Sequence, residues 1–232
     1  MDRRWQSSRG NVDVDFFKTW TPEMAYVLGY FSADGAMYVN SLGARYINFV
    51  STDYDLLKKI KAILNARHEI KLKRAKNNRW RKCCWLQIGS KGLFNDLIEL
   101  GLTPNKEFTL MLPAVPRPFC RHFVRGYFDG DGCVSHGHYA RKNRDGKATF
   151  YLLTRFIGTS KPFLEVLWRR LSQEAGINGG SVVQRKHTTF LNALKIVESG
   201  DVAKPGLSRL PVTQEVAGSN PVVPATVIRF AT

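Results

Sequence analysis

The chain has 232 residues, and its 35 lysines and arginines outnumber its 19 aspartates and glutamates, which gives a formal net charge of +16. With 44% hydrophobic residues it can bury a substantial core, so intrinsic disorder as the main state is excluded. It contains no run of about 18 apolar residues, which excludes a membrane-spanning helix. The excess positive charge favours a polyanionic partner, and nucleic acid is the first candidate.

The N-terminus and the cysteines indicate an intracellular protein. The basic residues in MDRRWQSSRG are not followed by the apolar stretch of a secretory signal, so we expect a protein that is not secreted. The four cysteines include no CxxC pair. Reduced thiols are therefore expected, rather than a disulfide framework or a zinc site.

The first predicted helix has clear signals at both ends. Thr21 provides a hydroxyl cap and Pro22 suits the first helical position, so a helix is expected to begin there. It should run to about residue 33 and stop at Asp34, with Gly35 in the left-handed conformation that often follows a helix.

Further elements follow in regular order. Alternating and helical spacings of apolar residues predict strands over 36–40 and 46–52, a helix over 55–64, two strands within 69–88 that turn at 77–78, and a helix over 92–102.

The same order of elements returns later in the chain. Three segments recur at offsets of 97, 107 and 108, namely 25–39 as 122–136, 49–64 as 156–171, and 85–88 (WLQI) as 193–196 (ALKI). Three matches in the same order indicate an internal duplication, and hence two similar domains.

The second copy lacks a counterpart of the last helix. Residues 199–232 contain four of the ten prolines and show no periodicity, and we expect a disordered tail there. The predicted organisation is an N-terminal extension (1–14), a first domain (15–112), a truncated second domain (113–198) and the tail.

Small residues line one face of each repeated helix. Gly29 and Ala33 are four positions apart, as are Gly126 and Gly130, so the two helices can pack closely about a pseudo-twofold axis. One aspartate follows each stripe, at the C-terminal end of the helix, where a carboxylate opposes the helix dipole. A divalent cation relieves that penalty, and hard oxygen ligands suit Mg²⁺.

The repeated motifs VLGYFSADG (27–35) and VRGYFDGDG (124–132) resemble the two signature motifs of a LAGLIDADG homing endonuclease in its single-chain form. The resemblance implies an α+β fold of two pseudo-symmetric αββαββα domains, whose saddle-shaped antiparallel sheets lie in the DNA major groove. It also implies that Asp34 and Asp131 bind the catalytic Mg²⁺, or another divalent cation such as Mn²⁺. Ser32 and Asp129 occupy an earlier acidic position of the motif, which the family does not reliably use.

The resemblance also implies a basic or polar residue near the metal. Lys91, which follows the predicted strand WLQIGS, is the best match for this catalytic residue, and Gln87 is the second candidate. Lys195, in the second copy, does not align with Lys91.

Clusters of basic residues at the predicted hairpins favour contacts to DNA. In 70–73, apolar and basic residues alternate, as expected for a strand with one face toward a groove. The DNA-binding candidates are Lys71, Lys73, Arg74, Lys76, Arg79 and Arg81, then Arg141, Lys142, Arg144 and Lys147, and finally Arg185 and Lys186.

The expected function is metal-dependent, site-specific double-strand cleavage of DNA by a monomer, which promotes the mobility of its own intron or gene. Two alternatives stay open. One is an RNA maturase or a DNA-binding relative that does not cleave, and the other is a decayed, inactive copy. The intact aspartates argue against the first alternative, and the atypical tail argues for the second.

Overall fold

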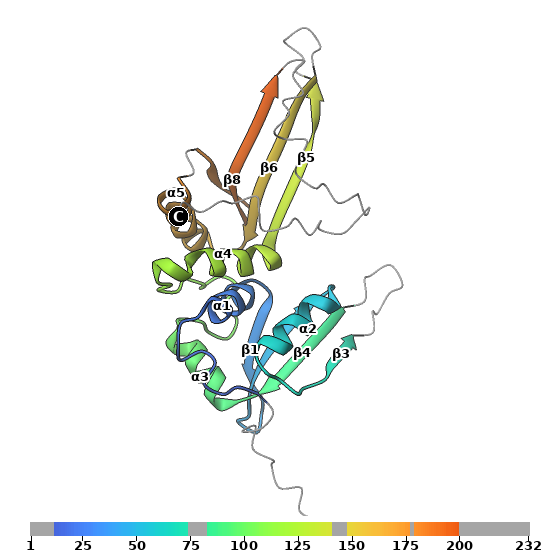
Figure 1. Ribbon diagram of the computed structural model, residues 1–232, viewed down its shortest axis with the longest axis vertical. Coiled ribbons are helices and arrows are strands. Elements are labelled where there is room, and N and C mark those ends of the chain that lie inside the picture. Colours follow the sequence, from blue (N-terminus) through green and yellow to red (C-terminus); the bar gives the residue numbers. More distant parts are fainter. Residues whose placement is uncertain (1–11, 74–82, 141–147, 177–178, 200–232) are drawn as a thin grey trace, which may run out of the picture. The chain divides into compact units, whose positions relative to one another are not determined.

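A computed structural model describes residues 12–73, 83–140, 148–176 and 179–199. The chain forms two compact units, residues 1–130 and 131–232. Each unit contains one four-stranded antiparallel sheet together with helices (Figure 1). The predicted α+β fold is confirmed.

The first seven elements of the first unit follow the predicted order αββαββα. They are α1 (Pro22–Asp34), β1 (Gly35–Val39), β2 (Arg45–Ser51), α2 (Tyr54–Ile63), β3 (Ile70–Lys73), β4 (Cys83–Gly89) and α3 (Lys91–Glu99). The unit also contains α4 (Arg117–Asp131), whose last residue opens the second unit. The strands pair in the order β1-β2-β4-β3, and α2 packs on β2 and β4. Buried side chains alternate along β2 and β4, so the helices cover only one face of this sheet.

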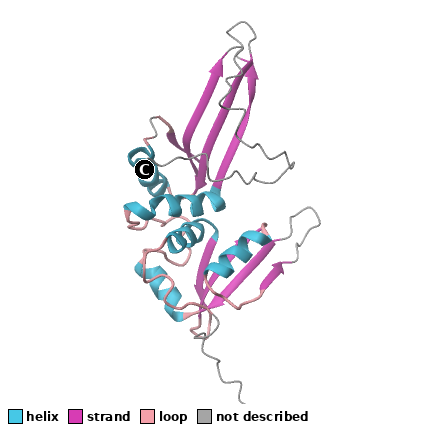
Figure 2. Cartoon of the chain, in the orientation of Figure 1, coloured by secondary structure: helices cyan, strands magenta, loops and turns pink. Residues whose placement is uncertain are grey.

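The second unit repeats the ββαββ part of this order (Figure 2). It contains β5 (Gly132–Ala140), β6 (Ala148–Gly158), α5 (Lys161–Ala175), β7 (Ser181–Arg185) and β8 (Thr188–Ser199), with the strand order β5-β6-β8-β7. Helix α5 packs on β6, β7 and β8. The predicted tail covers 199–232, but Ser199 is the last residue of β8, and residues 200–232 lie outside the described residues.

Side-chain caps begin α1, α2 and α5, and those of α2 and α5 occupy equivalent places in the two units. The Thr21 hydroxyl accepts a hydrogen bond from the Met24 amide at 3.0 Å, as the sequence predicts. Asp53 caps α2, and Ser160 caps α5. These two residues are 107 positions apart, which is the offset of the repeat in this segment.

Gly35 does not adopt the predicted left-handed conformation. Its φ of −81° and ψ of 149° are extended, and it is the first residue of β1. Glycine is required there for a different reason, because an added Cβ would overlap the aromatic ring of Phe31. The prediction was wrong because a strand begins directly after the helix, with no turn between them.

The register of the fourth strand also differs from the sequence match. Phe49 pairs with Leu86 in the first unit, and Phe156 pairs with Leu191 in the second, so β4 and β8 correspond at an offset of 105 rather than 108. The second sheet has a register shift between Thr154 and Arg155, which inserts Ala193 into β8. A bulge of this kind is invisible in an apolar pattern as short as four residues.

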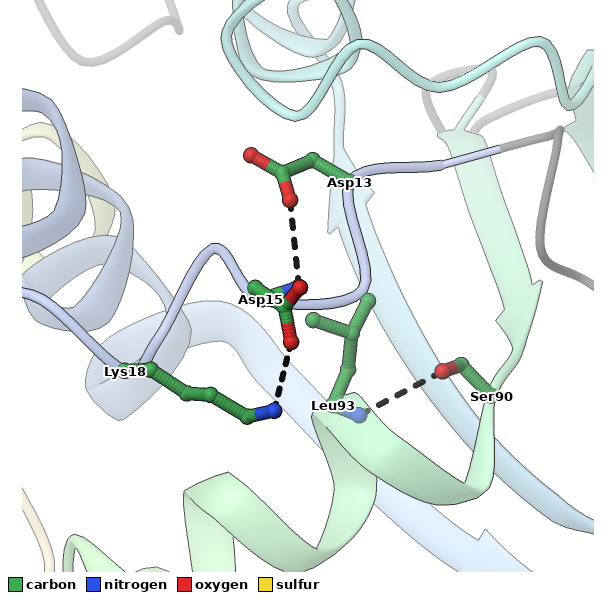
Figure 3. Close-up of polar contacts among 5 residues, drawn as sticks. All are labelled: Asp13, Asp15, Lys18, Ser90 and Leu93. Carbon is green, nitrogen blue, oxygen red and sulfur yellow. Dashed lines mark hydrogen bonds and ion pairs between the residues drawn. The ribbon is translucent and has the colours of Figure 1, made fainter.

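An N-terminal segment ties the helices of the first unit together. The Asp13 amide donates to the Leu64 carbonyl at 3.1 Å, directly after α2. The Lys18 ammonium pairs with the Asp15 carboxylate at 2.5 Å, beside the start of α3 (Figure 3). Phe17 is buried. Among the described residues, no helix has the length and apolar character needed to cross a membrane.

Candidate functional site

Helices α1 and α4 pack against each other through their glycines. A Cβ on Gly29 would overlap the Phe123 carbonyl, and a Cβ on Gly126 would overlap the Tyr26 carbonyl. The two contacts are reciprocal, since both residues of one are 97 positions from their counterparts in the other. This contact confirms that the small-residue stripes pack the two repeated helices together.

Asp34 lies at the end of this helix pair. It is the last residue of α1, and its Oδ2 is 3.3 Å from the position of a Cβ on Gly130. That Cβ would also lie 2.5 Å from the Cβ of Ala33. Glycine at position 130 is therefore required by the close approach of Ala33, and it brings the Asp34 carboxylate close beside α4.

A buried lysine that the sequence did not indicate lies beside Asp34. Lys106 is only 8% exposed, and its ammonium group donates hydrogen bonds to the carbonyls of Gly35, at 2.6 Å, and Ala33, at 3.3 Å. It therefore satisfies carbonyls at the C-terminal end of α1, which carries the negative end of the helix dipole. The segment around it, TPNKEF, has no periodicity that would have singled it out.

The pKa of the Asp34 carboxyl is raised above its ordinary value. Although part of its surface reaches solvent, the surrounding protein removes hydration from the charged form, and this desolvation is the main cause. Lys106 opposes the shift most strongly, followed by Tyr30, and both lower the pKa. Because the folded state holds the proton more tightly than the unfolded state, this group lowers stability as the pH rises through its titration range.

Replacing Lys106 with methionine should raise the pKa of Asp34 further. If Asp34 binds a metal, protons and the metal compete for the carboxylate, so the acid limb of the pH profile of DNA cleavage should move to higher pH. Single-turnover cleavage rates between pH 5 and 9 measure this shift.

The control is Lys18→Met. Lys18 is paired with Asp15 and does not affect the pKa of Asp34, so the pH profile should stay unchanged. A profile of Lys106→Met that coincides with that of the wild-type protein would contradict the proposed coupling.

Asp131 ends α4 as Asp34 ends α1, and in each case a strand begins at the next residue. The earlier positions of the motif have structural partners instead. The Ser32 hydroxyl donates to the Leu28 carbonyl at 2.8 Å, and Asp129 accepts a hydrogen bond from the Tyr26 hydroxyl at 2.7 Å.

The residues at the helix ends fit a hard divalent cation. Carboxylate oxygens are the donors that Mg²⁺ prefers, and the C-terminal end of a helix attracts a positive charge. No group of three or more His, Cys, Asp or Glu side chains suited to a metal occurs in the described parts of the chain. A cation at either helix end would therefore need water or phosphate oxygens to complete its coordination, as is usual for Mg²⁺.

The structure places Lys91 at the far end of the first sheet from Asp34. Gly35, which follows Asp34, lies opposite Phe49, and Phe49 lies opposite Leu86 on β4. Lys91 follows Ser90, and the Ser90 amide donates to the Arg45 carbonyl at the other end of β2. Four residues of strand separate Leu86 from Ser90, or about 13 Å. Lys106, and not Lys91, is the lysine that contacts the end of α1.

Gln87 lies on the face of the first sheet that α2 does not cover. It is paired with Asn48, and its amide donates a short hydrogen bond to the Tyr38 hydroxyl. The Tyr38 ring stacks on Tyr46, with centroids 5.2 Å apart. This face presents amide and aromatic groups suited to the edges of bases.

The described residues include only part of the predicted basic clusters. Lys71 is exposed on β3, and Arg185 and Lys186 are exposed at the turn between β7 and β8. Lys73 ends β3, but its side chain is not described. The remaining candidates lie outside the described residues, namely Arg74, Lys76, Arg79, Arg81, Arg141, Lys142, Arg144 and Lys147.

Comparison with known families and structures agrees with this arrangement. A family model described as a LAGLIDADG-like domain matches residues 21–99. The fold is similar to that of I-SmaMI bound to uncleaved DNA in the presence of calcium ions, with 12% identity, a TM-score of 0.51, and coverage of 78% of this chain and 80% of that one. It is also similar to the I-LtrWI LAGLIDADG homing endonuclease bound to target DNA, with 14% identity, a TM-score of 0.50, and 80% of each chain covered.

A curated relative adds little about function. The chain is 29% identical over 131 residues to an uncharacterized protein of Methanocaldococcus jannaschii, MJ0398. The match covers 54% of this chain and 44% of the relative, so the chain spans less than half of that protein's length. Because the solved structures named above share only 12% and 14% sequence identity with this chain, their similarity establishes its fold.

Proposed function

We propose that this chain belongs to the LAGLIDADG family and is a site-specific, metal-dependent DNA endonuclease, since a LAGLIDADG-like domain model matches residues 21–99 and the fold is similar to those of I-SmaMI and the I-LtrWI homing endonuclease. It would make double-strand breaks by phosphodiester hydrolysis and so promote the mobility of its own intron or gene. Its partner would be a double-stranded DNA site, bound by a monomer.

The observation that carries the proposal is the pair of helices that pack through reciprocal glycines, each ending in an aspartate. Asp34 and Asp131 would hold Mg²⁺ or Mn²⁺. When bound, such a cation supplies an activated water and stabilises charge on the scissile phosphate. We assign Lys106 the role of keeping the Asp34 carboxylate deprotonated, in place of Lys91, because Lys106 lowers the pKa of Asp34.

The test is cleavage of linear DNA that spans the gene's own locus with the gene removed. We expect two discrete fragments with Mg²⁺ and no cleavage when EDTA replaces the metal. Specific binding without cleavage would favour a maturase or a DNA-binding relative. A folded protein that neither binds nor cuts would be a decayed copy.

DNA binding should weaken steeply with salt. If the basic side chains neutralise roughly 6–10 phosphates, the affinity should fall by about 10³- to 10⁵-fold between 50 and 200 mM salt, because each contact releases condensed counterions. Binding titrations in EDTA at several salt concentrations measure the slope of log affinity against log salt.

Single substitutions then assign that slope to residues. Glutamine in place of either Lys71 or Arg185 should reduce the magnitude of the slope of log affinity against log salt by about 1, if the replaced residue contacts a phosphate. Lys18→Gln serves as the control, because Lys18 is paired with Asp15 and should leave the slope unchanged. Affinity that does not depend on salt would contradict the proposed backbone contacts.

A further inference from the structure

A row of polar side chains crosses the second sheet on the face away from α5. Phe156 and Leu191 are fully buried, whereas their neighbours Arg155 and Asn192 are half-buried and pair with each other across β6 and β8. Because side chains alternate along a strand, these neighbours lie on the opposite face from the buried pair. The row follows from the register of the four strands and consists of Cys133, Arg155, Asn192 and Ser181.

Hydrogen bonds fix the middle of this row. The Arg155 Nε donates to the Asn192 Oδ1 at 3.0 Å, and the Asn192 Nδ2 donates to the Ser181 Oγ at 3.1 Å. The guanidinium also lies over the Phe190 ring, 5.4 Å from its centroid. Because a hydrogen bond and an aromatic ring both position the Arg155 side chain, it loses little rotamer entropy when it binds a ligand.

The positioned guanidinium of Arg155 has two terminal nitrogens that can donate to a ligand. Its Nε is engaged by Asn192, and in the described part of the chain the two terminal nitrogens make no hydrogen bond of their own. Two parallel N–H donors match the O6 and N7 acceptors that guanine presents in the major groove. A lysine ammonium lacks this planar fork.

We propose that Arg155 reads a guanine in the half-site bound by the second sheet, with Asn192 and Phe190 as its positioning residues. This inference rests on the proposed function, since it requires a specific DNA target. Arg155 pairs with Cys133, which is two residues from Asp131, so the guanine lies within the few base pairs closest to the cleaved bond.

The first sheet carries different chemistry at the equivalent positions. Ala36 pairs with Asn48, and Asn48 with Gln87, in the row that corresponds to Cys133, Arg155 and Asn192. The Oδ1 of Asn48 is buried and has no hydrogen-bond partner among the described residues. Amides suit adenine rather than guanine, so the two half-sites should differ and the target should not be a palindrome.

The test measures the affinity of the wild-type protein for its locus DNA, in EDTA, after each central base pair is changed in turn. Replacement of one G·C pair, in one half-site, should weaken binding by about 5- to 150-fold. Arg155→Gln should abolish that preference and leave the preferences at other positions intact. Asn192→Ala should weaken the same preference without moving it to another base pair.

The outcomes separate this inference from the proposed function. An Arg155→Gln variant that loses affinity equally for every sequence would make Arg155 a phosphate contact and overturn the inference, as would an unchanged preference for guanine. In both cases, specific binding by the wild-type protein would leave the proposed function standing. Wild-type protein that binds all sequences equally would overturn both. Lys18→Gln controls for the effect of removing one surface charge, because Lys18 belongs to the first unit and is paired with Asp15.

Discussion

Replacing Asp34 or Asp131 with asparagine is expected to lower the rate of Mg²⁺-dependent DNA cleavage by about a hundredfold or more. Asparagine keeps the shape of the side chain but removes the negative charge that holds the cation. DNA affinity should stay within a few fold of wild type, because the basic surface is unchanged. Single-turnover cleavage and binding titrations on the locus DNA separate the two effects.

Asp129→Asn is the matched control. Asp129 is near Asp131 in the sequence, but it accepts a hydrogen bond from Tyr26, and an asparagine oxygen can accept the same bond. Cleavage by this variant should stay within a few fold of wild type. If Asp129→Asn abolished cleavage and the Asp34 variant did not, the assignment of the metal ligands would be wrong.

Gly126→Ala is expected to lower the free energy of unfolding by at least about 2 kcal/mol, because small-to-large changes at tight contacts force the backbone to shift. An added methyl group would overlap the Tyr26 carbonyl, which is backbone and cannot move aside as a side chain would. Urea unfolding followed by circular dichroism measures the change.

The control for this variant is Gly92→Ala. Gly92 lies in α3, and a Cβ there would be 3.6 Å from the Val14 carbonyl, an ordinary van der Waals distance. Alanine also favours a helix over glycine by about 0.5–1 kcal/mol, so this variant should be as stable as the wild type or slightly more stable. Equal stabilities of the Gly126 and Gly92 variants would show that the helices do not pack through their glycines.

The features that the sequence predicted correctly depend on local or repeated patterns. The cap at Thr21 and the order of elements in the first unit follow from signals within a few residues. The pairing of α1 and α4 was predictable because the same stripe of small residues occurs twice, and a duplicated motif implies a symmetric contact.

The features that the sequence could not predict depend on contacts between distant segments. Lys106 reaches the end of α1 from more than 70 positions away, and no periodicity in its own segment indicates burial. Arg155 acquires its partner Asn192 only through the register of β6 and β8, which a bulge shifts by one residue. The hydrogen-bond partners of a side chain at the centre of a sheet come from neighbouring strands, so the sequence of its own strand does not reveal them.

The most direct test of the metal assignment is anomalous X-ray diffraction from Mn²⁺ in crystals of the protein bound to its locus DNA. The account predicts anomalous peaks about 2.0–2.2 Å from carboxylate oxygens of Asp34 and Asp131, the range for Mg²⁺ and Zn²⁺ bound to oxygen ligands. Mn²⁺ peaks elsewhere on the protein–DNA complex, with neither carboxylate in contact with a metal, would contradict it.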